Sequence, residues 1–72
     1  MEIVRDGESY NIVGFFVARD PFTEGNPYTL FYALRPGHGF IAKHFKCYQD
    51  AIRALNLATR ATGLPQVGGY VD

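Results

Sequence analysis

The stretch that decides the fold is YTLFYALRPGHGFIAKHF, residues 28–45. Residues 28–35 are rich in aromatic and β-favouring side chains, which predicts a strand. The strand ends at Pro36-Gly37, where Pro followed by Gly is the order that a type II turn requires. A second β-favouring run, residues 40–45, follows the turn. This stretch therefore predicts an antiparallel hairpin.

A further strand is expected on the N-terminal side of this hairpin. Residues 10–19, YNIVGFFVAR, carry apolar side chains on both faces, which is typical of a central strand or of one whose second face is covered. Gly14 within this run indicates a bulge or the close approach of another backbone. The turn formers of residues 20–27 predict a long loop before the hairpin. Ile3 and Val4 open one more possible short strand, which ends at the turn-prone pair Asp6-Gly7.

On the C-terminal side, the spacing of apolar residues changes from two to about 3.6, which predicts a helix from Tyr48 to Thr62. Cys47 occupies the N-cap position, and Gly63 followed by Pro65 provides a stop signal. The stripe expected to face the sheet consists of Tyr48, Ala51, Ile52, Leu55, Ala58, Thr59 and Thr62. A second apolar strip, with mostly small side chains, lies between Arg53 and Arg60 and consists of Ala54, Leu57 and Ala61. We expect this strip either to pack under the C-terminal tail or to meet a partner.

These elements place the protein in the α+β class. We expect a three- to four-stranded antiparallel β-meander with one C-terminal α-helix packed on one face, in the order β-β-β-α. Residues 1–63 form the expected single domain, and residues 64–72 form a partly ordered tail. The 72 residues are 47% hydrophobic, which is enough apolar content to form one small core, and intrinsic disorder is not expected.

The cysteine count and the N-terminus bear on the compartment. Cys47 is the single cysteine, which excludes an internal disulfide and a zinc site with several cysteines, and a free thiol fits a reducing compartment. No basic region leads into an apolar one after Met1, and no apolar run approaches the length of a membrane span. We expect a cytoplasmic protein that does not contact membranes.

No motif in the chain predicts catalysis. His38 and His44 lack the spacing of metal ligands, and no base follows Cys47 at a recognisable spacing. The short Gly37-His38-Gly39 segment is not followed by a helix, as a phosphate-binding loop requires. We therefore expect that the protein is not an enzyme and has no catalytic, cofactor-binding or metal-binding residues.

Charge is distributed unevenly along the chain, although the formal net charge is zero. Residues 1–34 carry five acidic and two basic side chains, whereas residues 35–72 carry two acidic and five basic ones. One interpretation is a functional basic patch around residues 40–45 and the helix. The other is ordinary scatter in a short sequence. The two interpretations stay open at this stage.

The first interpretation predicts a surface that binds another protein. Its basic residues would pair with acidic groups of the target, and aromatic anchors would provide affinity, although each aromatic residue also suits the core. The predicted partner-binding residues are Lys43, Lys46, Tyr48, Arg53, Arg60, Phe22 and Tyr70.

Residues 39–63, with FKCYQDAIRAL at 45–55 after the last strand, resemble the end of AP2-type DNA-binding domains. In those domains a three-stranded sheet precedes a helix, and basic and aromatic side chains on the sheet read DNA. This chain departs from that pattern, because residues 28–34 contain no Arg or Lys. A nucleic-acid-binding module is the alternative function that this resemblance implies, and its affinity would fall steeply with added salt.

In size and layout the whole chain resembles the small phage-encoded inhibitors of host bacterial RNA polymerase. The resemblance implies a non-catalytic regulator that docks on the host polymerase or a similar complex and blocks transcription in the bacterial cytoplasm. A protein this small, without a catalytic group, alters a larger complex by occupying a surface or blocking a movement. We expect a monomer, and a third hypothesis is strand pairing with a second copy at an exposed sheet edge.

Overall fold

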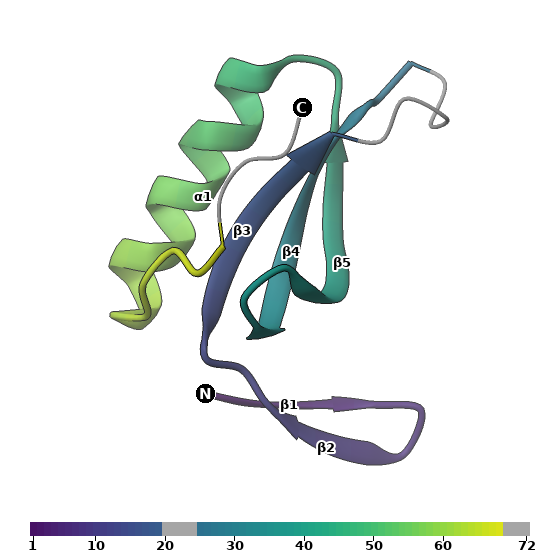
Figure 1. The fold of residues 1–72 in the computed structure, drawn as a ribbon, viewed down its shortest axis with the longest axis vertical. Helices are drawn as coiled ribbons and strands as arrows, with labels where there is room; N and C mark the ends of the chain where they lie inside the picture. The colour runs from purple at the N-terminus through teal and green to yellow at the C-terminus, as the bar shows by residue number, and fades with distance from the viewer. Residues whose placement is uncertain (20–24, 69–72) are drawn as a thin grey trace.

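The computed structural model describes residues 1–19 and 25–68 and confirms the α+β class (Figure 1). The described strands form two antiparallel sheets, and one C-terminal helix packs on the larger sheet. The elements are β1 (Glu2–Arg5), β2 (Glu8–Asn11), β3 (Gly14–Arg19), β4 (Tyr28–Arg35), β5 (His38–Phe45) and α1 (Tyr48–Thr62).

The larger sheet is the predicted meander, with the strand order β3-β4-β5. Phe15 lies opposite Tyr32, and Val17 lies opposite Leu30. Gly37 adopts a φ of 77°, as position three of the predicted Pro-Gly turn requires. The pairing of β4 with β5 shifts register twice, between Leu30 and Phe31 and between Ala33 and Arg35, as it does at β-bulges. β4 has the predicted bounds, whereas β5 begins at His38, two residues before the predicted start at Phe40.

The smaller sheet is a hairpin of β1 and β2, and it corrects one prediction. Residues 10–19 do not form a single strand, because the chain leaves the hairpin at Ile12 and Val13 and enters the larger sheet at Gly14. The Ile12 N–H donates to the Met1 carbonyl oxygen at 2.6 Å, and the Val13 N–H donates to the Ala33 carbonyl oxygen at 2.9 Å. The backbone N–H groups of two successive residues thus donate in different places, one beside the hairpin and the other at β4 of the larger sheet. The chain passes from one sheet to the other at this point.

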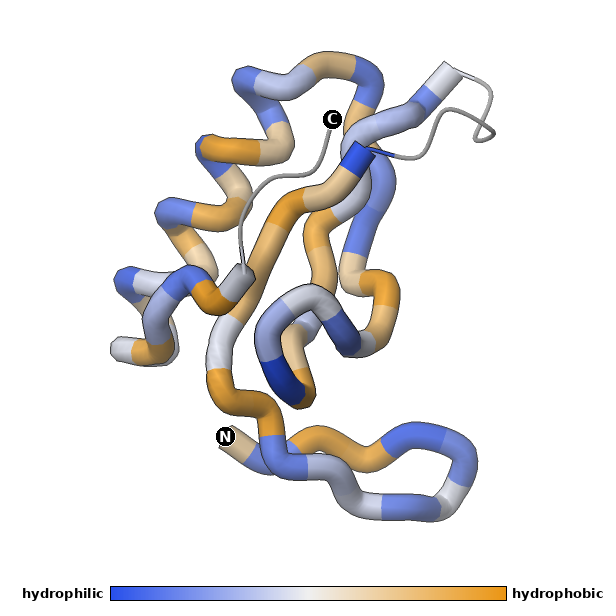
Figure 2. The backbone as a smooth tube through the Cα atoms, in the orientation of Figure 1, coloured by the Kyte–Doolittle hydropathy of each residue, from blue (hydrophilic) through white to orange (hydrophobic). Residues whose placement is uncertain are grey.

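The core lies between the larger sheet and α1. Phe15, Val17 and Leu30 from the sheet pack against Ala51 and Leu55 from the helix, and all five are buried. Figure 2 shows hydrophobic colour along the middle of β3. Burial of such side chains contributes about 1.5–3 kcal/mol each for the large ones, so this layer holds the domain together.

The helix begins and ends where predicted. Cys47 is the N-cap residue, although its side chain makes no capping hydrogen bond, and Gly63 is the C-cap, with a φ of 72°. The Gly63 N–H donates to the Thr59 carbonyl oxygen at 2.9 Å. Ala54 differs from expectation, because it packs against the core rather than lying in a separate strip.

Residues after the helix cover the outer edge of β3. The Phe15 N–H donates to the Pro65 carbonyl oxygen at 3.1 Å, and the Val67 N–H donates to the Phe15 carbonyl oxygen at 2.9 Å. A Cβ atom at Gly14 would collide with the Pro65 carbonyl oxygen. The predicted close backbone approach at Gly14 is therefore confirmed, and it serves to admit the segment that follows α1.

In the part of the chain that the structure describes, no helix combines the length and the apolar character that crossing a membrane requires.

Candidate protein-binding surface

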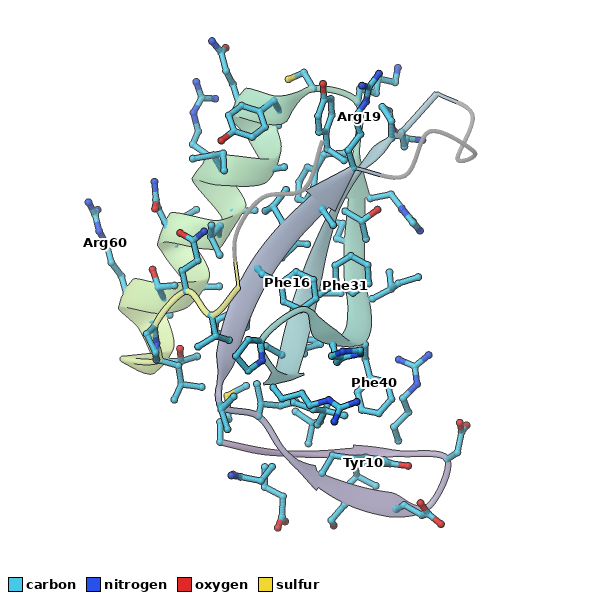
Figure 3. All side chains as sticks on the ribbon, viewed as in Figure 1. Tyr10, Phe16, Arg19, Phe31, Phe40 and Arg60 are labelled. Carbon is cyan, nitrogen blue, oxygen red and sulfur yellow. The ribbon has the colours of Figure 1, made fainter. Side chains whose placement is uncertain are left out.

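The outer face of α1 carries the three residues that we call the helix ridge: Arg53, Leu57 and Arg60. Their spacing of four and three residues places them on one side of the helix. All three are exposed, and the Leu57 side chain is 65% accessible. Figure 3 shows Arg60 extending from α1 away from the sheet. The ridge thus presents one large apolar side chain between two cations.

The position of the ridge follows from the helical period of about 3.6 residues, because one side of α1 is buried against the sheet. Ala51 and Leu55 point into the core, so residues about half a turn away from them point to solvent. Asp50 in the first turn and Arg60 in the last turn both complement the helix dipole. The ridge is therefore fixed on a helix that is anchored along its whole length.

One ion pair touches the helix ridge. An Arg53 guanidinium nitrogen lies 3.7 Å from an Asp50 carboxylate oxygen, and both side chains are largely exposed. An exposed pair with this spacing is worth only about 0.3–0.5 kcal/mol. The cost of redirecting Arg53 toward a partner's carboxylate is correspondingly small.

A second group of predicted residues gathers where β5 ends and α1 begins. The rings of Tyr28 and Tyr48 meet at 67°, with their centroids 5.8 Å apart. The Lys43 ammonium lies 5.4 Å from the centroid of the Phe45 ring, within the range of a cation–π interaction. Lys46 is exposed beside them, and Tyr48 is 42% accessible. We call these five residues the helix-start cluster.

The structure therefore divides the predicted partner-binding residues into two groups. Lys43, Lys46 and Tyr48 belong to the helix-start cluster, whereas Arg53 and Arg60 belong to the helix ridge. From Tyr48 to Arg60 the helix rises about 18 Å, so the two groups occupy different parts of the surface. Phe22 and Tyr70, the other two predicted anchors, lie outside the described residues.

Leu57 is the ridge residue that was not among the predicted partner-binding residues, although it belonged to the predicted apolar strip between the two helical arginines. Its strip was expected either to pack under the tail or to meet a partner. In the structure Ala54 packs against the core, and Leu57 stays exposed. The signal that distinguishes Leu57 from Ala54 and Ala61 is the size of its apolar side chain, on the helical side opposite the buried stripe.

The sheet face opposite α1 is largely apolar. The Phe16 and Phe31 rings stack with centroids 4.7 Å apart and planes at 7°, and Ile41 beside Phe31 is 49% accessible. His44 on the same face shares a 2.8 Å hydrogen bond with the hydroxyl of Thr29. No Lys or Arg occupies the interior strand positions 16, 18, 29, 31, 41 or 44.

Neither a pocket nor a group of three or more potential metal ligands occurs among residues 1–19 and 25–68. Cys47 is exposed at the start of α1 with its thiol free. The described surface carries groups suited to ion pairing, cation–π contact and burial of exposed apolar side chains.

Comparison with known proteins does not place the chain in a family. It matches no protein-family model, no curated protein and no solved structure.

Proposed function

We propose that this protein is a small non-catalytic regulator that docks on a larger protein complex through its helix ridge. The observation that carries the proposal is the 65% exposure of Leu57 between Arg53 and Arg60. A solvated helix face needs no large apolar side chain at its centre. An apolar anchor flanked by two cations is instead suited to a partner groove with acidic walls.

The residues of the helix ridge have different roles in the proposed binding. Burying the Leu57 side chain in a partner contributes on the order of 2 kcal/mol. The two arginines add little net affinity at an exposed rim, but they accelerate encounter with an acidic surface and disfavour basic ones. Leu57 thus provides affinity, and the arginines provide selection of the partner.

The helix-start cluster extends the surface at the N-terminal end of α1. Tyr48 is a second candidate anchor, because tyrosine is enriched among residues that dominate binding energy. Lys43 and Lys46 add positive charge on the same end of the molecule. A target that covers both groups would meet about 20 Å of helix, which corresponds to a small interface.

Bacterial RNA polymerase is the first target to test, following the resemblance in size and layout to phage-encoded inhibitors of that enzyme. On this proposal the protein blocks transcription by occupying a surface of the polymerase or by preventing one of its movements. Binding to one state only is sufficient for such inhibition, since a ligand shifts an equilibrium by its difference in affinity for the two states.

The test measures binding of the tagged protein to purified bacterial RNA polymerase by biolayer interferometry, together with transcription from a defined promoter. Arg60→Glu and Leu57→Ser should each weaken binding by about tenfold. Arg35→Glu is the matched control, because it makes the same charge change at an exposed residue at the end of β4. Circular dichroism verifies that each variant is folded.

Capture from bacterial lysate widens the search beyond the polymerase. Proteins that remain bound to the wild type after nuclease treatment and are lost with Arg60→Glu would support docking through the ridge. Equal capture by the wild type and Arg60→Glu would refute the proposed surface. Capture that disappears with nuclease would instead favour the nucleic-acid-binding alternative.

A further inference from the structure

The β1–β2 hairpin has an exposed face that mirrors the helix ridge with opposite charge. Glu2 and Val4 are two residues apart on β1 and therefore share one face of the hairpin, and Asp6 follows at the turn. Val4 is 71% accessible, and Glu2 and Asp6 are exposed. We call Glu2, Val4 and Asp6 the hairpin triplet.

The opposite face of the hairpin contacts β5 of the larger sheet. The Tyr10 ring contacts Phe40 of β5, and the Arg5 guanidinium lies 4.8 Å from the centroid of the same ring. Since Arg5 is committed to Phe40, the one described basic side chain of the hairpin faces away from the triplet. The hairpin triplet is left as an acidic face with an apolar centre.

The spacing of Glu2 and Val4 is close to that of Arg53 and Leu57. Glu2 and Val4 are about 6.6 Å apart along the extended strand, and Asp6 follows in the turn after Arg5. Arg53 and Leu57 are separated by about 6 Å along the helix axis, and Leu57 and Arg60 by about 4.5 Å. With the two apolar side chains in contact, each carboxylate falls within reach of an arginine, because the arginine side chain is long and flexible.

We infer that the hairpin triplet of one copy docks on the helix ridge of a second copy. Val4 packs on Leu57, and Glu2 and Asp6 pair with Arg53 and Arg60. Three of the four described acidic side chains, Glu2, Asp6 and Glu8, lie on the hairpin, so the partner with complementary charge is present in the same chain.

This contact joins different copies rather than two parts of one molecule. The hairpin lies beyond one end of the larger sheet, whereas α1 lies along the face formed by β3, β4 and β5 (Figure 1). Because the two surfaces differ, the interface is head-to-tail, and a pair of copies retains one free triplet on one copy and one free ridge on the other. Association therefore continues beyond a dimer as concentration rises.

The interface is weak and sensitive to salt. One hairpin face against one helix face falls below the area of about 1,200 Å² that is typical of stable complexes. The attraction between its exposed charges extends over a Debye length of about 30 Å at 0.01 M salt but only about 3 Å at 1 M salt. The protein is thus a monomer when dilute and associates when concentrated at low salt. Self-association occupies the same ridge as the proposed target, although neither proposal depends on the other.

The experiment is sedimentation velocity of the full chain over a wide range of concentration, at low and at high salt. Wild-type protein should show a sedimentation coefficient that rises with concentration and falls with salt. A helix-reversed variant (Arg53→Glu, Arg60→Glu) and a hairpin-altered variant (Glu2→Lys, Asp6→Asn) should each associate at least about tenfold more weakly. Asn is used at position 6 because it tolerates the positive φ of 51° found there.

The decisive measurement is made on an equimolar mixture of the two variants. Each carries a surface that complements the other, so the mixture should associate although neither variant does so alone. Val4→Ser should weaken self-association and leave target binding unchanged, which separates this inference from the proposed function. Arg35→Glu is again the charge control.

Three results would overturn the inference. The first is a wild-type protein that stays monomeric at low salt and high concentration. The second is a mixture that fails to recover association. The third is association that survives both charge variants but is lost in Ile41→Lys, because copies would then pair along β5 and the adjoining sheet face.

Discussion

Tyr10 meets Phe40 edge-to-face, with ring centroids 4.8 Å apart and ring planes at 72°. Tyr10 lies on β2, and Phe40 lies on β5, so this contact joins the two sheets (Figure 3). Arg5 of β1 adds a cation–π contact to the same ring. The orientation of the hairpin, and hence of its exposed acidic face, depends on one aromatic side chain of the larger sheet.

Phe40→Ala should release the hairpin from the larger sheet without unfolding α1. We expect amide hydrogen exchange in β1 and β2 to accelerate by about tenfold, because the aromatic pair and the cation–π contact are lost together. Exchange in β3 and α1 should change little. Ile41→Ala, one residue away on the opposite sheet face, is the control, and a hairpin that exchanges at the wild-type rate in Phe40→Ala would contradict the assignment.

Gly14→Ala should destabilise the protein through the segment that follows α1. The new Cβ atom would collide with the Pro65 carbonyl oxygen and approach a Val67 methyl carbon to 2.9 Å. Overpacking of this kind costs about 1–3 kcal/mol, measured by urea denaturation. A chain that ends at Leu64 supplies the control, because Gly14→Ala should cost much less there. Equal losses in both backgrounds would show that the strain comes from another source.

Local signals explain why much of the fold could be predicted. The turn at Pro36-Gly37, the change of period at Tyr48 and the stop at Gly63 are each encoded within a few residues. Helical periodicity likewise predicts that Arg53 and Arg60 are exposed. The meander and the helix therefore follow from sequence without knowledge of any long-range contact.

The features that could not be predicted depend on partners distant in sequence. The apolar run of residues 10–19 continues across the break at Ile12 and Val13, so alternation alone does not reveal that its two halves join different sheets. The break is fixed by hydrogen bonds to Met1 and Ala33. Lys43, Lys46 and Tyr48 of the helix-start cluster were predicted, but the part of Tyr28 was not, because it meets Tyr48 across 20 positions of the chain.

Tyr10 should titrate at a pH above that of an ordinary tyrosine. Its hydroxyl donates to a Glu8 carboxylate oxygen at 2.9 Å, and this bond is the largest cause that raises the pKa of Tyr10. Partial desolvation and the charge of Asp6 raise it further, whereas Arg5 opposes them. Nuclear magnetic resonance titration of the ring of Tyr10 measures this pKa, and Glu8→Ala should lower it toward the ordinary value. No change in Glu8→Ala would show that the hydrogen bond is not formed in solution.

The sign of the pH dependence follows from this shift. The pKa of Tyr10 is higher in the folded than in the unfolded state, so the protonated phenol favours folding. The stabilisation is complete below the unfolded pKa of about 10, and it is lost as the pH rises through the folded value. Tyr10→Phe should remove this contribution to alkaline unfolding, which is followed by circular dichroism.

Leu55 and Leu57 provide a matched pair that tests the two sides of α1. Leu55 is 2% accessible and packs in the core, whereas Leu57, two residues later, is 65% accessible. Urea denaturation should show that Leu55→Ala costs about 2–5 kcal/mol, because it leaves a cavity. Leu57→Ala should change the free energy of unfolding by no more than about 0.5 kcal/mol.

The comparison bears directly on the helix ridge. If Leu57→Ala were as costly as Leu55→Ala, the outer face of α1 would be a covered part of the folded chain and could not receive a partner. If Leu57→Ala leaves stability intact but abolishes target binding or self-association, Leu57 contributes to contacts rather than to folding. Dilute protein is required for the stability measurement, because association through the ridge would itself favour the folded state.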